Sequence, residues 1–145
     1  MKNIMIVYWS GTGNTQKMAV GIAEGAKADD IEVKMTTVDA AVKEDVLKAD
    51  GIALGCPAMG NEILEESEME PFVESLLTEN LQGKPLALFG SFDWGDGQWM
   101  REWQERMEAS GAKMVADGLT VQGTPDEEGM AESKKLGAKL VQALG

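Results

Sequence analysis

Apolar and polar positions along the chain follow two periods, one typical of buried strands and one typical of amphipathic helices. Residues 3–8 form an apolar, β-branched run that ends at a glycine-rich turn, which predicts a strand buried on both faces. Residues 15–27 then repeat apolar side chains at three- and four-residue spacings, which predicts a helix with one buried stripe. Further strands are predicted at 31–37, 51–55, 86–90 and, more weakly, 113–121, and helices at 42–48, 68–77, 98–110 and 126–144.

This strict alternation predicts an α/β fold in three layers, with a parallel sheet between helices on both faces. A length of 145 residues suits one domain, 1–145, and no repeat, linker or shift in composition marks a second one. In such a sheet, ligands bind at the carboxyl ends of the strands. The loops that follow the strands therefore form the candidate site.

The loop between the first strand and the first helix suits a phosphate. Its glycines allow close approach of the backbone, and the first N–H groups of the helix, three hydroxyls and an amide provide donors. The loop is not a Walker A motif, and Gln16 stands where a dinucleotide fingerprint needs its third glycine. An ordinary capped turn is the alternative. The candidate residues are Ser10, Gly11, Thr12, Gly13, Asn14 and Thr15.

Two later loops carry side chains suited to a flat ligand. A turn that Gly and Asn favour presents a polarizable methionine, and a tryptophan followed by glycines is poorly placed for a core and should be exposed. Trp99 and Trp103 are instead expected in the core, as is Cys56. The candidates are Pro57, Ala58, Met59, Gly60, Asn61 and Glu62 after the third strand, and Ser91, Phe92, Asp93, Trp94, Gly95 and Asp96 after the fourth.

Charge and composition exclude several classes of function. There are 13 Lys and Arg against 25 Asp and Glu, a formal net charge of −12, which disfavours nucleic acid and anionic membranes as partners. The chain has no histidine and one cysteine, so Ser-His or Cys-His hydrolysis, an intramolecular disulfide and a cysteine-cluster metal site are excluded. No signal layout or long apolar stretch is present, which favours the cytoplasm.

The acidic residues are concentrated between positions 49 and 83, where there is no Lys or Arg. Most of these carboxylates are expected on solvated helix faces. Together they would place the turn at Met59 in a negative field. The run consists of Asp50, Glu62, Glu65, Glu66, Glu68, Glu70, Glu74 and Glu79.

Taken together, the three loops resemble those of the short-chain flavodoxins, especially of anaerobic bacteria, and the resemblance runs from the first strand to the last helix. The motifs that carry it are YWSGTGNT at 8–15 and GCPAMG at 55–60. The resemblance implies a five-stranded sheet of order 2-1-3-4-5 and noncovalent FMN as the redox centre. It also implies that residues 10–15 hold the FMN phosphate, with Ser91 near the outer edge of that phosphate.

The resemblance further implies roles at the flavin ring. Met59 and Trp94 would sandwich the isoalloxazine, the Glu62 carboxylate would bond the flavin N3–H, and a peptide flip would let the Gly60 carbonyl accept a hydrogen bond from the reduced flavin N5–H. Three positions depart from the relatives. Pro57 lacks a hydroxyl that some offer the phosphate, Asn61 replaces Asp or Ser after the flipping glycine, and Asp93 replaces Gly.

The implied function is one-electron transfer without substrate chemistry, with FMN cycling between semiquinone and hydroquinone. The acidic surround disfavours an anionic hydroquinone and so lowers the potential. The same acidic surface would attract basic-faced reductases and electron acceptors to a monomer through a transient interface.

Three other readings remain open. An FMN-dependent quinone or nitro reductase would need a substrate pocket. A signalling receiver would need acidic residues where this chain has Tyr8-Trp9 and Cys56. A protein that serves one dedicated enzyme as its activator would share every feature of a general carrier.

Overall fold

A parallel sheet forms the middle of the molecule because the most apolar segments become its central strands. The computed structural model describes residues 1–60 and 62–144. Strand order is β2-β1-β3-β4-β5, as the resemblance implied, and β6 also pairs with β4. The strands are β1 (Lys2–Tyr8), β2 (Ile31–Thr37), β3 (Gly51–Gly55), β4 (Pro85–Phe92), β5 (Lys113–Met114) and β6 (Leu119–Gln122). Every residue of β3 is buried, which agrees with its unbroken apolar run.

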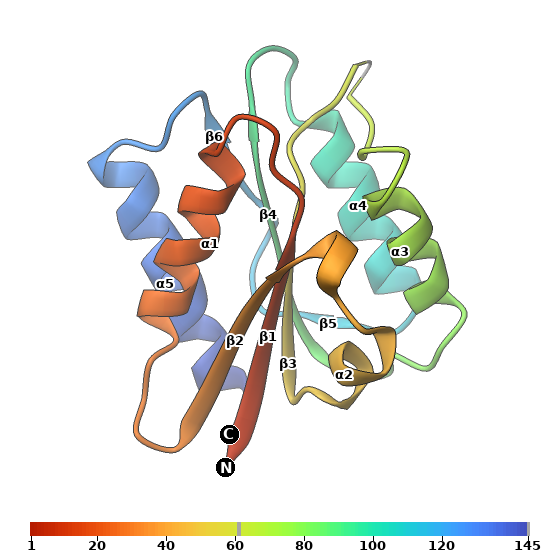
Figure 1. The fold of residues 1–145 in the computed structure, drawn as a ribbon, viewed down its shortest axis with the longest axis vertical. Coiled ribbons are helices and arrows are strands. Elements are labelled where there is room, and N and C mark those ends of the chain that lie inside the picture. Colours follow the sequence, from red (N-terminus) through yellow and green to blue (C-terminus); the bar gives the residue numbers. More distant parts are fainter. Residues whose placement is uncertain (61, 145) are drawn as a thin grey trace.

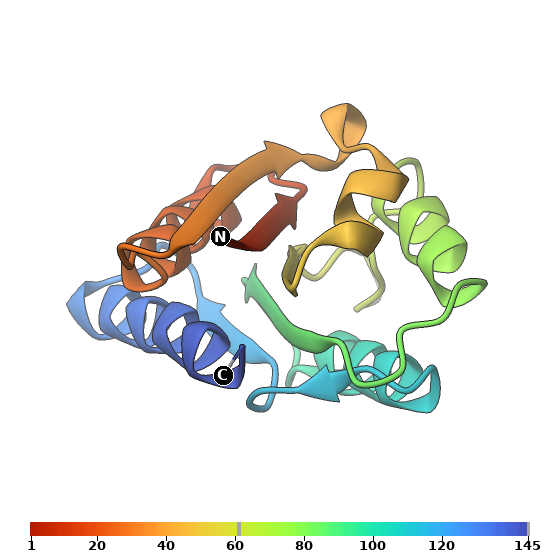
Figure 2. The same ribbon diagram turned by 90° about the horizontal axis from the view of Figure 1, so that it is seen from below.

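Helices cover both faces of the sheet, and each face has its own core (Figures 1 and 2). One core lies under α1 and α5 and contains Met18, Phe89 and Leu140. The other lies under α2, α3 and α4 and contains Trp99 and Trp103, which are 2% and 1% exposed, so their predicted core positions are confirmed. The helices are α1 (Asn14–Gly25), α2 (Lys43–Lys48), α3 (Met69–Leu77), α4 (Gln98–Ala109) and α5 (Glu127–Ala143), with a 3-10 turn at Val38–Ala40.

The fifth strand differs from the sequence prediction. Instead of one weak strand over 113–121, β5 pairs with the beginning of β4 and β6 pairs with its end. The strap between them, residues 115–118, lies against α4, where the Gln104 side chain accepts from Gly118 N–H (2.9 Å) and donates to Asp117 (3.2 Å). A Cβ at Gly118 would lie 2.5 Å from the Met100 sulfur. These contacts draw the strap away from β4 and divide the strand.

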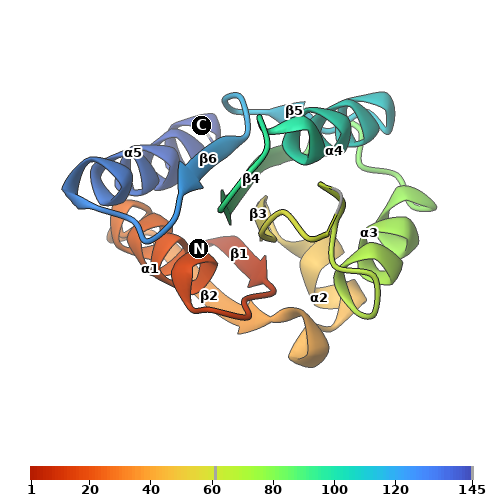
Figure 3. The ribbon, with the colours of Figure 1, turned by 90° about the horizontal axis from the view of Figure 1, so that it is seen from above.

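Helices α1 and α5 pack closely because a glycine on each helix lies against the backbone of the other. A Cβ on Gly137 would lie 2.1 Å from the carbonyl oxygen of Ile22, and one on Gly25 would lie 1.9 Å from that of Lys134. This close packing fixes α1 beneath the loop that precedes it. The loops after β1, β3 and β4 all lie at one edge of the sheet, which Figure 3 shows from above.

Candidate functional site

The three candidate loops meet around one cavity of about 160 Å³. It lies at the carboxyl ends of β1, β3 and β4, which is where a parallel sheet of this kind binds ligands. We call the loops the Ser10 loop (10–15), the Met59 turn (59–60 and 62–63) and the Trp94 loop (93–97). The cavity is lined by Trp9, Gly11, Thr12, Asn14, Pro57, Ala58, Met59, Ser91, Phe92 and Asp93.

In the Ser10 loop, side-chain hydroxyls accept from some backbone N–H groups, and other N–H groups have no acceptor among the described residues. The Ser10 hydroxyl accepts from Gly13 N–H (3.0 Å) and Gln16 N–H (3.4 Å), and Gly13 adopts φ 94°, which glycine tolerates best. Within the described part of the chain, the backbone N–H groups of Gly11, Thr12 and Thr15 have no acceptor. The loop contains no Lys or Arg. It can therefore bind an anion through neutral dipoles at the start of α1.

A buried hydroxyl pair ties the Ser10 loop to the end of β4. The hydroxyls of Thr15 and Ser91 lie 3.1 Å apart, and Ser91 N–H donates to Thr15 Oγ1 at 3.3 Å. Thr15 and Ser91 are 1% and 4% exposed. Both were candidate ligands; Ser91 lines the cavity, and Thr15 does not. Their bond fixes the first helical turn relative to β4.

The Met59 turn is closed by its own backbone. Met59 and Ile63 exchange two hydrogen bonds of 2.9 and 3.0 Å, and Gly60 has φ 47°. Met59 is half-buried and lines the cavity, while Gly60 is exposed. Asn61, one of the candidates, lies outside the described residues. The turn thus presents the sulfur-bearing side chain of Met59 to the cavity, and next to it an exposed glycine in a conformation that glycine tolerates well.

The Trp94 loop presents an exposed ring beside the same opening. Trp94 is 60% exposed, which confirms the sequence expectation, and Asp93 beside it is exposed too. The end of β6, a segment that the sequence did not indicate as part of the site, also binds this loop. Gly123 N–H donates to the Phe92 carbonyl (2.8 Å), and the Gln122 amide donates to that of Asp93 (3.3 Å).

The remaining candidates in the Trp94 loop, Gly95 and Asp96, do not line this cavity. Asp96 pairs with Arg101 at 3.1 Å, and both side chains are exposed. Gly95 packs on Glu62, whose carboxylate accepts from the N–H groups of Gly97 and Gln98 instead of standing free. The structure therefore joins Glu62 to α4, a contact across 35 residues that local sequence patterns could not indicate.

Most carboxylates of the acidic run between 49 and 83 have partners. Glu65 is buried rather than solvated and accepts from the N–H groups of Ser67, Glu68 and Met69 at 2.7–3.0 Å. Burial raises its pKa, but these hydrogen bonds outweigh burial and hold the pKa of Glu65 below its usual range. Glu70 forms a two-bond pair with Arg106 (2.7 and 2.9 Å), and the pKa of that guanidinium is raised accordingly.

These pairings reduce the local charge that the sequence suggested. Glu70 and Glu79 are paired with Arg106 and Lys43, whereas among the described residues Glu68 accepts only from the neutral indole N–H of Trp9, at 3.1 Å. Trp9 also lines the cavity, so it is a site residue that the candidate set lacked. Its place directly before the Ser10 loop was the available signal. A neutral donor, unlike a paired Lys or Arg, brings no positive charge to the site.

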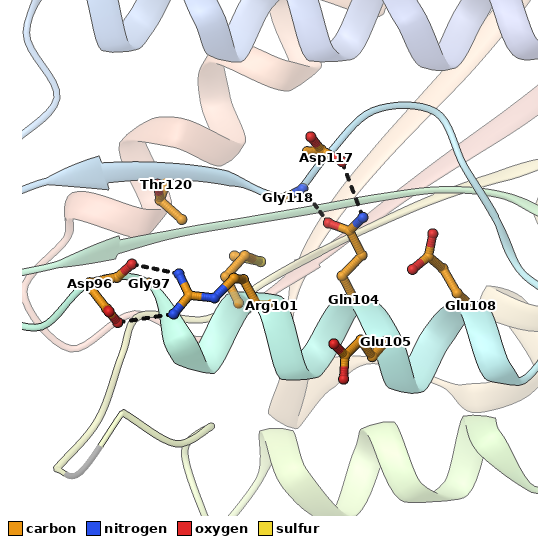
Figure 4. A pocket seen from close by; sticks show the side chains of 10 residues that line it. Asp96, Gly97, Arg101, Gln104, Glu105, Glu108, Asp117, Gly118 and Thr120 are labelled. Carbon is orange, nitrogen blue, oxygen red and sulfur yellow. Dashed lines mark hydrogen bonds and ion pairs between the residues drawn. The ribbon is translucent and has the colours of Figure 1, made fainter.

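A larger cavity, of about 420 Å³, lies elsewhere, between α4 and the strap at 115–118 (Figure 4). Its walls carry carboxylates of Asp96, Glu105, Glu108 and Asp117, with the Arg101 guanidinium turned toward Asp96. It shares no residue with the cavity between the three loops. It lies along the side of the sheet rather than at the strand ends.

In the described part of the chain, no helix is long and apolar enough to cross a membrane.

Comparisons with known proteins agree with the fold and identify the family. The flavodoxin family model matches residues 6–137. The flavodoxin of Clostridium beijerinckii is 51% identical over 122 residues, which is 84% of this chain and 88% of that protein. The flavodoxin of Megasphaera elsdenii is 43% identical over 140 residues, 97% and 99% of the two chains. The solution structure of two-electron reduced Megasphaera elsdenii flavodoxin superposes with a TM-score of 0.84 at 41% identity, covering 96% of this chain and 98% of that one. The chain therefore belongs to the flavodoxin family, and its close homologues, the flavodoxins, bind FMN and are electron carriers rather than enzymes.

Proposed function

We propose that this chain holds FMN in the cavity between its three loops and carries single electrons at low potential between basic-faced partner proteins. One observation carries this proposal: the Ser10 loop, which has backbone N–H groups without acceptors and no Lys or Arg, lines the same cavity as Asp93, the neighbour of the exposed Trp94. Bound FMN supplies one-electron redox chemistry, and the protein supplies binding and electrostatics.

The Ser10 loop fits the phosphate of FMN. Its N–H groups without acceptors converge at the N-terminus of α1, where the helix dipole favours an anion. A Cβ on Gly13 would meet nothing within 4 Å, so the loop is open to a ligand there. The exposed Thr12 hydroxyl and the half-buried Asn14 amide add donors at the cavity wall. We assign Ser91 a supporting role, because its hydroxyl is buried against Thr15.

The cavity fits one edge of a flavin ring. Its 160 Å³ is below the roughly 300–1,000 Å³ of enclosed ligand pockets, so a ring would lie partly outside it. Met59 lines one wall and Trp94 stands exposed at the rim, and each provides a surface against which a flat ring can lie. The ring edge that protrudes would be the route for electrons.

Charge around the opening supports the low potential and the kind of partner. Asp93 lines the cavity and is exposed, and the exposed Glu68 bonds the indole of Trp9, which also lines the cavity. Carboxylates near the ring disfavour the addition of a further negative charge, which lowers the potential of that step. The same charges steer basic surfaces toward the exposed edge and favour rapid, transient contact.

The visible spectrum of the purified protein tests this proposal. We expect a yellow protein with one FMN per chain and quenched flavin fluorescence. The midpoint potential for the addition of the second electron should lie below that of free FMN. Trp94→Ala should raise the FMN dissociation constant about 5- to 150-fold, because stacking on an aromatic side chain contributes about 1–3 kcal/mol. Met35→Ala, which removes an exposed apolar side chain from β2, is the control. A colourless protein that FMN cannot reconstitute would refute the proposal.

A further inference from the structure

The Glu62 carboxylate forms a connection between the Met59 turn and α4. Its Oε1 accepts from the backbone N–H of Gly97 at 2.9 Å and of Gln98 at 3.1 Å. Gln98 is the first residue of α4, and Gly97, the N-cap position, provides no side-chain cap of its own. The first N–H groups of a helix lack intrahelical acceptors, and a negative charge near them is favourable. Glu62 therefore supplies from another loop the cap that α4 lacks.

The backbone around this carboxylate is held in an unusual conformation. Within the described residues, Glu62 is the one non-glycine residue with a positive φ, 58°. Such a conformation is unfavourable for a residue with a Cβ and persists where surrounding contacts enforce it. Gly95 encloses the side chain from the opposite side, since a Cβ there would lie 2.5 Å from the Glu62 carboxyl group. Gly95 itself adopts φ 94°. The Met59 turn and the Trp94 loop thus close on one side chain.

We propose that Glu62 is a positioning residue: it latches the Met59 turn to the first turn of α4 and thereby sets the opening between Met59 and Trp94. Both hydrogen bonds of the latch use Oε1, and among the described residues no donor is bonded to Oε2. One carboxylate can then fix both walls of the opening before a ligand enters, which lowers the ordering cost of binding. This inference rests on the proposed FMN site for its ligand, while the latch is a property of the chain.

Amide hydrogen exchange measured by NMR on the full-length protein as purified tests the latch. In Glu62→Ala, exchange at Gly97 and Gln98 should accelerate at least tenfold, while the core amide of Leu88 keeps its wild-type rate. In the same variant, the FMN dissociation constant, measured from flavin fluorescence on dilution, should rise about tenfold to a hundredfold. Glu62→Gln retains an acceptor oxygen and should restore most of both properties. Glu66→Ala removes an exposed carboxylate from the same segment and should change neither.

The outcomes separate the latch from the FMN site. Unchanged exchange at Gly97 and Gln98 in Glu62→Ala would overturn the latch, even if FMN affinity fell, since the loss would then reflect direct contact with the ligand. If Glu62→Ala accelerates Leu88 as well, Glu62→Gln decides, and rapid exchange at Gly97 and Gln98 in that variant would also overturn the latch. A wild-type protein that binds no FMN would refute the proposed function, and the exchange rates would still test the latch.

Discussion

Removing the buried carboxylate of Glu65 should weaken the fold in a way that depends on pH. Glu65 is 8% exposed and accepts from three successive backbone N–H groups, at 2.8 Å from Ser67, 2.7 Å from Glu68 and 3.0 Å from Met69. Met69 begins α3, and the N-cap residue Glu68 provides no side-chain cap. Glu65 is therefore the group that satisfies the first turn of α3.

The magnitude follows from these bonds. Losing a helix cap costs about 0.5–2 kcal/mol, and leaving a buried N–H without an acceptor costs about 1–3 kcal/mol. Because such contributions are not additive, we expect Glu65→Ala to lower the free energy of unfolding by about 2–4 kcal/mol at pH 7. Glu65→Gln keeps one acceptor oxygen and should lose about half as much.

The pH dependence fixes the sign of the charge effect. The pKa of Glu65 in the folded protein lies below its ordinary value of 4.5, so the unfolded chain binds its proton first as pH falls. The stabilisation is therefore fully present above about pH 4.5 and is lost as pH falls through the folded pKa. The difference in unfolding free energy between wild type and Glu65→Gln should narrow over that range.

Urea unfolding followed by circular dichroism, at matched FMN concentration and at pH 7, 5, 4 and 3, measures this difference. Glu66→Gln is the matched control, because the neighbouring carboxylate is exposed. A Glu65→Gln difference that stays constant from pH 7 to pH 3, or that equals the control, would refute the reasoning. The charge of Glu65 would then contribute nothing to the cap.

Two further predictions concern buried groups. Gly137→Ala should lower the free energy of unfolding by about 1–3 kcal/mol despite the better helix propensity of Ala, because its Cβ would lie 2.1 Å from the Ile22 carbonyl oxygen; thermal unfolding measures this, and an unchanged Tm would contradict it. Burial raises the pKa of Cys56 to about 12; the charges of Glu65 and Glu70 also raise it, and the hydrogen bond from the N–H of Glu65 lowers it. At pH 8 a thiol reagent should therefore label Cys56 no faster than the protein unfolds. Labelling within seconds in native buffer would contradict this.

The sheet was predictable because its central strands are defined by local pattern. Each of β1, β3 and β4 contains an unbroken apolar run, and burial on both faces requires that composition. The divided fifth strand was not predictable in the same way. Its break depends on Gln104 and Met100, which contact the strap from another helix, and no periodicity within 113–121 records those contacts.

The site was predictable to the level of loops, but the roles of its carboxylates were not. Glu65 and Glu66 are adjacent and chemically identical, yet one caps α3 from a buried position and the other is exposed. They differ in their position relative to the first turn of α3, and the local sequence does not indicate that position. Likewise the partners of Glu62 lie 35 and 36 residues away, so its link to α4 appears only when β3 and β4 are side by side.

The cation-free Ser10 loop has a consequence for how binding responds to ionic strength. Phosphate sites built from Lys and Arg lose affinity in salt, because small ions compete with the ligand for those charges. In the proposed complex the donors are neutral, and the phosphate approaches a chain of net charge −12. Salt screens that repulsion, over a Debye length of about 10 Å at 0.1 M, and small anions find no Lys or Arg in the loop to compete for. We therefore expect physiological salt to favour the proposed complex, whereas it would weaken binding at a basic site.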